Sequence, residues 1–400
     1  MLANDLQSLE ACSLVCRVMF ASARRIIHRR ISLTLQKNWE LLTSTEKQRY
    51  NRGEKQGIAI KMLSGIAARG LLPYARHLSI NVNEDFTPTN LQPFNHHFQC
   101  FDRIQELSIY WLDTPGFLEN FDTYFMNFVP TLRSLHLDTP IGDGRDILDF
   151  VCRFPHLDDL TFKIEAFHDW GTWRSGPLPV VKSVPPFRGR LKLDGIVGLG
   201  SNLLQQLISL PGKRHFRSID FRGCNAEEEQ PIIDACSDTL ESVSTTWKRF
   251  CKRLSFFQTT AILIQGVVDE KGLPVNLTDA TNLRSLTLRV DFKAIRYSYG
   301  ALSRTLSTIT SPLFSEFVLE VERVPRTLEP ARSAWMWWLE TWTELDKMFE
   351  RIDIERGFRV VIRAEKVDKE SSFAAQAENR LPLMAARKGI VFEIGQFPEK

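Results

Sequence analysis

The sequence has no apolar run approaching the ~20 residues that a bilayer-spanning helix needs. Its N-terminus carries Asp5 and Glu10 and lacks the basic-then-apolar layout of a secretory leader. The seven cysteines are odd in number and scattered, so we expect no disulfide framework. These absences predict a protein that works without a membrane anchor, in the reducing cytoplasm or nucleus.

Recognisable catalytic and metal-binding motifs are also missing. The eight histidines form no nucleophile–base–acid pattern. The stretch Gly195-Ile-Val-Gly198-Leu-Gly200 has neither phosphate-loop spacing, so we expect a turn there. His96, His97 and Cys100 lack the second cysteine pair of a zinc finger, and we expect a loop before the strand that follows. We therefore predict no catalysis, no cofactor and no metal.

What the sequence does contain is a six-residue motif that occurs twice with one difference. The hexapeptide Leu-Arg-Ser-Leu-His-Leu at 132–137 returns as Leu-Arg-Ser-Leu-Thr-Leu at 283–288. Read as a strand, this pattern places its last two leucines on one face, because side chains alternate along a strand. Related hexapeptides occur along the chain, and each has an apolar residue at its fourth position. These fourth positions are Leu78, Leu107, Leu135, Leu160, Leu191, Ile219, Val243, Leu286, Phe317 and Val360.

Seven of the nine gaps between these positions measure 24 to 31 residues, close to the ~20–29-residue period of leucine-rich repeats. The gaps after 243 and 317 are each 43 residues long, so we expect an insertion around 250–280. Residues 262–268 are a possible extra strand inside it. Between strands the apolar period becomes helical, at 117–128, at 147–151 and at 203–208, where Ser201 is the expected cap.

This pattern resembles that of leucine-rich repeats, which implies parallel strands alternating with helices in a solenoid. The family places Asn or Cys five residues after the fourth position, and only Asn83 and Cys224 match. The expected fold is therefore an irregular α/β leucine-rich-repeat-like solenoid. The alternative is an α/β protein with parallel strands and no true repeat.

The first 76 residues are basic, with 13 Lys and Arg against 5 Asp and Glu, and they read as helices throughout. From Leu6 to about Ile31 they resemble the second half of an F-box, chiefly through Leu14-Val-Cys-Arg17. Together with the repeats, this is similar to fungal F-box/leucine-rich-repeat-like proteins. That family opens its box with a Leu-Pro-x-Glu/Asp segment and a first helix, whereas only Met1 to Asn4 precede the match, so we expect an N-terminally truncated box.

The resemblance implies a helical segment at 1–72, with the box at about 5–31, followed by a solenoid at 73–400. The implied function is that of a substrate-receptor subunit of a cullin–F-box ubiquitin ligase, and the implied partner of the box is a Skp-type adaptor. The missing opening should weaken adaptor binding. The box residues that match the family, and that we expect to contact the adaptor, are Leu9, Leu14, Val15, Cys16, Arg17 and Phe20.

The repeat face is expected to bind an unknown target protein. His136 should face away from the leucines on either side of it, and the other candidate contacts are tryptophans. These are Trp111, Trp170, Trp173 and Trp337. We do not expect nucleic acid as a partner, because the Arg24-Arg25 and Arg29-Arg30 pairs come with no recognition motif. The alternatives are a stand-alone repeat scaffold and, last, an α/β enzyme.

Overall fold

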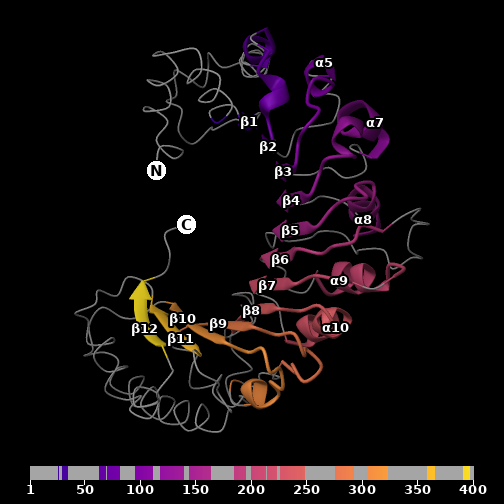
Figure 1. Cartoon of the computed structure of the whole chain (residues 1–400). Coiled ribbons are helices and arrows are strands. Elements are labelled where there is room, and N and C mark those ends of the chain that lie inside the picture. Colours follow the sequence, from indigo (N-terminus) through magenta and orange to yellow (C-terminus); the bar gives the residue numbers. More distant parts are fainter. Residues whose placement is uncertain are drawn as a thin grey trace, which may run out of the picture. The chain divides into compact units, whose positions relative to one another are not determined.

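A computed structural model gives the fold (Figure 1). It describes residues 26, 29–34, 63–68, 70–81, 95–110, 118–138, 144–163, 184–194, 200–212, 214–222, 226–247, 275–291, 302, 304–322, 358–364 and 391–396. The chain divides into two compact units, one of residues 1–190 with 201–212 and one of residues 191–200 with 213–400. Within the described residues, no helix has the length and apolarity to cross a bilayer.

In the first unit, five short strands pair in parallel and in chain order. They are β1 (Arg30–Thr34), β2 (His77–Asn81), β3 (Glu106–Tyr110), β4 (Ser134–Asp138) and β5 (Asp159–Lys163). The helical elements include η2 (Leu72–Tyr74), α5 (Asn95–Phe98), α7 (Phe121–Tyr124), η4 (Met126–Phe128), α8 (Gly144–Cys152) and α9 (Gly200–Ser209). Figure 1 shows α5, α7 and α8 on one side of strands β2 to β5.

The second unit repeats this arrangement. Its strands are β6 (Arg190–Asp194), β7 (Ser218–Arg222), β8 (Ser242–Trp247), β9 (Ser285–Asp291), β10 (Glu316–Glu322), β11 (Arg359–Ala364) and β12 (Val391–Gln396), and its helix α10 spans Ala226–Cys236. Each strand from β7 to β12 pairs in parallel with the next. Strands in chain order are what stacked strand–helix units produce, whereas a doubly wound sheet reverses its order at a switch point.

A recurring backbone contact argues that these units are true repeats. In the first unit, the carbonyl of Gln105, just before β3, accepts hydrogen bonds from the N–H groups of Arg133 and Ser134 at the start of β4. In the second unit, the carbonyl of Glu241 accepts in the same way from Arg284 and Ser285. In each case the acceptor occupies the second place of its hexapeptide, and the donors occupy the second and third places of the next one. The same hexapeptide therefore makes the same local structure in both units, which favours the repeat over the alternative of unrelated parallel strands.

The apolar residues of the hexapeptides form the core. All ten predicted fourth positions, from Leu78 to Val360, lie in strands β2 to β11, and each has 0 or 1 % of its surface exposed. On the helical side of the first unit, aromatic rings pack with their centroids 5.3–6.4 Å apart, mostly edge to face, a favourable arrangement for aromatic rings. The rings belong to Phe98, Phe101, Phe121, Tyr124, Phe125, Phe128, Phe150 and Phe154.

Several expectations need correction. The segment 1–72 is not helical throughout, because Arg30–Thr34 forms β1 and pairs with β2. The boundary at 72/73 is therefore not a boundary of the sheet. Strand β12 was not expected either. The two histidines at 96 and 97 lie in helix α5 rather than in a loop, and α9 begins at Gly200, one residue before the expected cap.

The two 43-residue gaps add no strand to the sheet between their flanking strands. Strand β8 pairs directly with β9, and β10 pairs directly with β11. Parallel neighbours need a crossover of a dozen or more residues in any case, so a long gap leaves the sheet intact. The possible strand at 262–268 and most of the expected insertion lie outside the described residues.

Candidate protein-recognition surface

Most polar side chains of the strands lie on the face opposite the core, which we call the strand face, because side chains alternate along each strand. In the first unit, the middle of this face is Ser79, Ser108, His136 and Thr161, all half-buried. The His136 ring packs 5.7 Å from Tyr110 on the neighbouring strand β3. This confirms that His136 faces away from Leu135 and Leu137, which are fully buried.

Charged side chains flank this row on both sides. His77 on β2 contacts Glu106 on β3, and Lys163 on β5 lies 3.0 Å from Asp138 on β4. These pairs join neighbouring strands, which is where opposite charges stabilise a sheet. The face of the first unit is thus polar, partly exposed and held on a rigid core, as a binding surface needs.

The other residues expected to bind partners lie outside the described part of the chain. They are the box residues Leu9, Leu14, Val15, Cys16, Arg17 and Phe20 and the tryptophans Trp111, Trp170, Trp173 and Trp337. Their contacts with an adaptor or a target therefore stay predictions.

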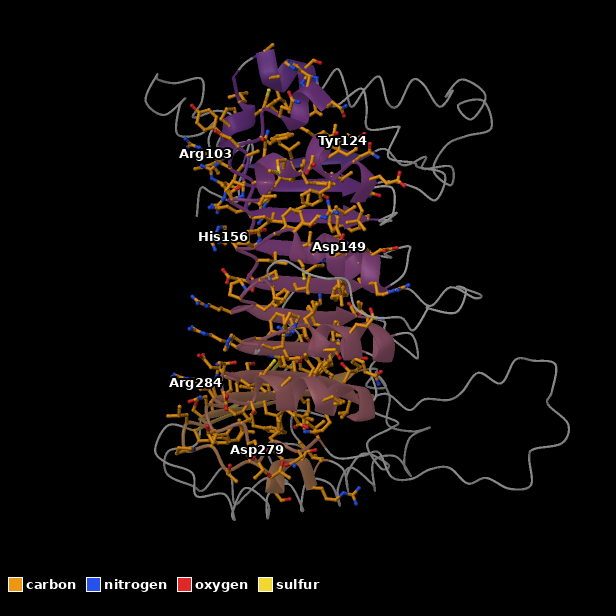
Figure 2. The ribbon with its side chains drawn as sticks, turned by 90° about the vertical axis from the view of Figure 1, so that its right-hand side faces the viewer. Arg103, Tyr124, Asp149, His156, Asp279 and Arg284 are labelled. Atoms are coloured by element: carbon orange, nitrogen blue, oxygen red, sulfur yellow. The ribbon has the colours of Figure 1, made fainter. Side chains whose placement is uncertain are left out.

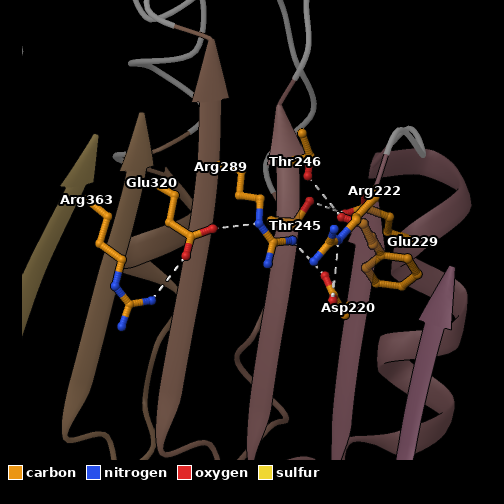
Figure 3. Close-up of polar contacts among 9 residues, drawn as sticks. Asp220, Arg222, Glu229, Thr245, Thr246, Arg289, Glu320 and Arg363 are labelled. Carbon is orange, nitrogen blue, oxygen red and sulfur yellow. Dashed lines mark hydrogen bonds and ion pairs between the residues drawn. The ribbon is translucent and has the colours of Figure 1, made fainter. Parts of the chain in front are cut away.

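The second unit carries a line of alternating charges across its strands, which the sequence reading missed (Figure 3). Arg289 on β9 donates from Nη1 to Asp220 on β7 at 2.7 Å and from Nε to Glu320 on β10 at 2.6 Å. Glu320 also accepts from Arg363 on β11 at 3.1 Å, and Arg222 on β7 lies 3.6 Å from Asp220. We call these five residues the charge line.

The charge line is largely buried. Asp220 is 1 % exposed, and the side chains of Arg289 and Glu320 are 14 % and 10 % exposed. Burial lowers the pKa of Arg289, but the negative charges and hydrogen bonds of Asp220 and Glu320 outweigh it, so the pKa of Arg289 is raised above its usual value. Arg289 therefore stays charged, and its forked guanidinium ties strands β7, β9 and β10 together.

A sequence signal for this line did exist. Arg222, Thr246, Arg289, Glu320 and Arg363 each stand three residues after the fourth position of their hexapeptide, and parallel register aligns that place across the strands. Comparing the residue at this place in successive hexapeptides would have revealed the alternating charges on β9, β10 and β11.

Two buried polar atoms on this face make no hydrogen bond in the described structure, although one of them, Arg222 Nε, has the ion pair with Asp220 at 3.6 Å. The Ser244 side chain is 8 % exposed, yet its Oγ has no hydrogen-bond partner in the described structure. The Nε of Arg222 is likewise buried without a hydrogen bond there. Register places Ser244 beside Asp220 on one strand and Thr287 on the other. Buried polar groups are normally paired, so these two are exceptions.

Two threonines next to Ser244 on β8 do have partners. The Thr245 hydroxyl, on the helix side of the sheet, donates to Glu229 of α10 at 2.7 Å, and the Thr246 hydroxyl, on the strand face, donates to the carbonyl of Phe221 at 3.1 Å. Cys236, also on α10, is fully buried, and burial raises the pKa of its thiol to about 12, against the opposing effects of a backbone hydrogen bond at Phe216 and of Arg214. Cys236 is therefore a small core residue and no nucleophile.

Figure 2 shows a second group of polar side chains, at the edge of the sheet where strands begin. Arg103 and His156 of the first unit lie along this edge, away from Tyr124 and Asp149 on the helices. Arg103 and Arg133 lie 3.8 and 3.9 Å from Asp102 and Asp158. These exposed pairs are screened by solvent and contribute little to stability.

The two histidines on α5 contact each other and a neighbouring serine. His97 Nε2 lies 3.1 Å from the Ser64 hydroxyl, and burial and the neighbouring His96 lower the pKa of His97. Among the described residues, no group of three or more His, Cys, Asp and Glu is placed to hold a metal ion.

Comparison with protein-family models, with curated proteins and with solved structures finds no match to this chain. What is established is therefore a solenoid-like α/β fold of parallel strands that presents polar strand faces.

Proposed function

We propose that this protein recognises another protein through its strand faces and does so as a substrate-receptor-like subunit of a cullin–F-box ubiquitin ligase. The observation that carries the first half is the polar strand face of each unit, held rigid by a core with almost no exposure. A rigid, partly exposed polar array loses little entropy when it binds, because its side chains are already ordered. Stacked repeats present such faces over a length that suits a protein partner.

The second half, membership of a ligase, rests on the resemblance of residues 6–31 to an F-box. On this proposal the box binds a Skp-type adaptor through Leu9, Leu14, Val15, Cys16, Arg17 and Phe20, and the strand faces hold the target.

Co-purification with the adaptor tests the ligase half. The chain and a version extended by a box opening are each mixed with a purified Skp-type adaptor. We expect the extended version to bind more strongly, because a box opening adds contact area. Leu14→Asp with Val15→Asp in the extended version should abolish binding, whereas Met126→Asp, at an exposed residue on η4, should leave it intact. If neither version binds, the ligase assignment fails and a stand-alone scaffold is the better description.

Photo-crosslinking tests the recognition half. A photoreactive residue at Tyr110, on the strand face, should capture the target of this protein in cells, whereas the same residue at exposed Met126, on the helical side, should not. Equal capture at both positions would contradict recognition by the strand face.

A further inference from the structure

We infer that Ser32, on strand β1, is a phosphorylation site for a serine kinase that selects arginine. The chain reads Arg29-Arg30-Ile31-Ser32-Leu33 there, with arginines three and two residues before the serine and an apolar residue directly after it. Kinases of this class hold their substrate as an extended chain, pair its arginines with carboxylates of the cleft and place the residue after the serine in an apolar pocket. The site needs only such a kinase and this chain, so it does not depend on the proposed function.

The structure presents the recognition groups to solvent. The side chains of Arg29, Arg30 and Ser32 are all exposed, whereas Ile31 and Leu33 are 4 % and 0 % exposed in the core. Because side chains alternate along a strand, Arg30 and Ser32 share the strand face. The reactive hydroxyl and the two guanidinium groups are therefore on the surface of the folded protein, and the backbone of Arg30–Thr34 is already extended.

Access to the apolar residue depends on the position of β1 in the sheet. Strand β1 is the first strand in the sheet order, and within the described residues it pairs only with β2 (Figure 1). A kinase that takes Leu33 into its pocket has to detach β1 from β2, since Leu33 is fully buried. A five-residue strand paired on one side opens more easily than an inner strand, because only one ladder of hydrogen bonds breaks.

Ser79 on β2 provides a comparison within the same chain. It lies directly opposite Ser32, and it follows Arg76 by three residues. Two residues before it stands His77 rather than an arginine, and its side chain is half-buried. Strand β2 pairs with β1 on one side and with β3 on the other. The second arginine and the edge position therefore distinguish Ser32 from Ser79.

The reaction at Ser32 is phosphoryl transfer from ATP. The hydroxyl oxygen attacks the γ-phosphorus, the bond from this phosphorus to the bridging oxygen breaks, ADP leaves, and the hydroxyl proton passes to a carboxylate of the kinase. The product carries a charge of about −1.5 to −2 at pH 7, and the exposed guanidinium of Arg30, two places away on the same face, can pair with it.

The phosphate would extend the middle row of the first unit's strand face. Register aligns Ser32 with the row of Ser79, Ser108, His136 and Thr161. That row consists of hydroxyl groups and one imidazole, so phosphorylation brings a strong negative charge to its end. This consequence alone rests on the proposed function, because it matters only if the strand face binds a target.

Phosphorylation of the full chain by the purified catalytic subunit of the cyclic-AMP-dependent protein kinase, with ATP and Mg²⁺, tests the inference. Mass spectrometry of the digested product locates the phosphate, and we expect it on Ser32 and not on Ser79. A synthetic peptide of residues 26–36 should react ~10–100-fold faster than the folded chain, which corresponds to a detached population of ~1–10 % for β1. Arg29→Ala and Arg30→Ala should each lower kcat/KM of the folded chain by ~10-fold or more, because each removes a charge-assisted contact with the kinase.

Ser32→Ala should remove this modification without changing the melting temperature, because the hydroxyl is exposed. Ser79→Ala is the matched control and should leave the rate at Ser32 unchanged. An unreactive peptide, or a rate at Ser32 that ignores both arginines, overturns the inference, as does a Ser79 that reacts as fast as Ser32. So does a folded chain that reacts more than ~1000-fold more slowly than the peptide, because only global unfolding would then expose the site. Adaptor binding and crosslinking at Tyr110 are measured without the kinase, so the proposed function stands or fails separately.

Discussion

Replacing Arg289 by methionine is the sharpest test of the charge line. The substitution keeps an apolar stem of similar length and removes the cation that Asp220 and Glu320 share. Breaking a buried ion pair by removing one partner costs ~3–5 kcal/mol, because it leaves uncompensated buried charge. Each carboxylate keeps a second arginine, Arg222 at 3.6 Å and Arg363 at 3.1 Å, so we expect the lower end, about 3 kcal/mol.

Urea unfolding measures this loss. With a slope of ~2–3 kcal/mol per molar urea for a unit of this size, the midpoint of the second unit should fall by about 1–1.5 M. Arg289→Lys should cost less, because it keeps the charge but loses the fork that reaches both carboxylates. Amide hydrogen exchange shows which strands are destabilised. The amides of strands β7 to β10 should lose protection, whereas those of β2 to β5 in the first unit should not change and serve as an internal reference.

A loss below ~1 kcal/mol for Arg289→Met would refute the reasoning, because that is the value of an exposed, screened pair. So would loss of protection spread equally over both units. In either case, the charge line would behave as ordinary, solvent-screened surface charge.

Three further outcomes follow from single residues. Gly189→Ala should lower stability by ~1–3 kcal/mol in thermal melts, because a Cβ there would lie 2.0 Å from Asp159 Oδ1, which accepts from the Arg190 N–H at 2.6 Å; adding Asp159→Ala should recover part of the loss, and an equal loss in both backgrounds would contradict the clash. Cys236 should resist iodoacetamide at pH 8 in the folded protein and react only on unfolding, because burial raises the pKa of its thiol to about 12; rapid labelling of the folded chain would show that the thiol is accessible. Burial and the neighbouring His96 lower the pKa of His97, so as pH falls the unfolded chain is protonated first, and the stability present above pH 6.5 should be lost below it. In His97→Gln, the free energy of unfolding should depend less on pH between about 5 and 7, and an unchanged pH dependence would mean that other groups cause it.

The core of this fold could be predicted from the sequence, because strand alternation is a local property. In Leu-Arg-Ser-Leu-His-Leu, two leucines two places apart must share a face, and the structure buries Leu135 and Leu137 completely. The regular spacing of the strands then predicted a stack of repeated units, because each unit buries its apolar side against the next one. The direct pairing of β8 with β9 means that no strand of the sheet lies between them, which agrees with an insertion, whereas the possible strand at 262–268 lies outside the described residues.

The strands at the two ends were harder to find for a physical reason. Strand β1 buries Ile31 and Leu33, and the apolar residues that precede them in the sequence keep helical spacing. Its strand structure depends on pairing with β2, which lies more than 40 residues away in the chain. Local propensity is weak for a strand this short, and the edge of an existing sheet decides the outcome.

By itself, the sequence determined which side chains are buried, since that depends on periodicity along one strand. The tertiary structure alone decided which polar side chains meet. Arg289 and Asp220 are 69 residues apart, and they form a pair only because parallel stacking aligns their strands two spacings apart on one face. The closeness of Gly189 to Asp159 and the unpaired Ser244 were settled in the same way. Recognition chemistry therefore depends on register between strands, whereas the fold depends on alternation within them.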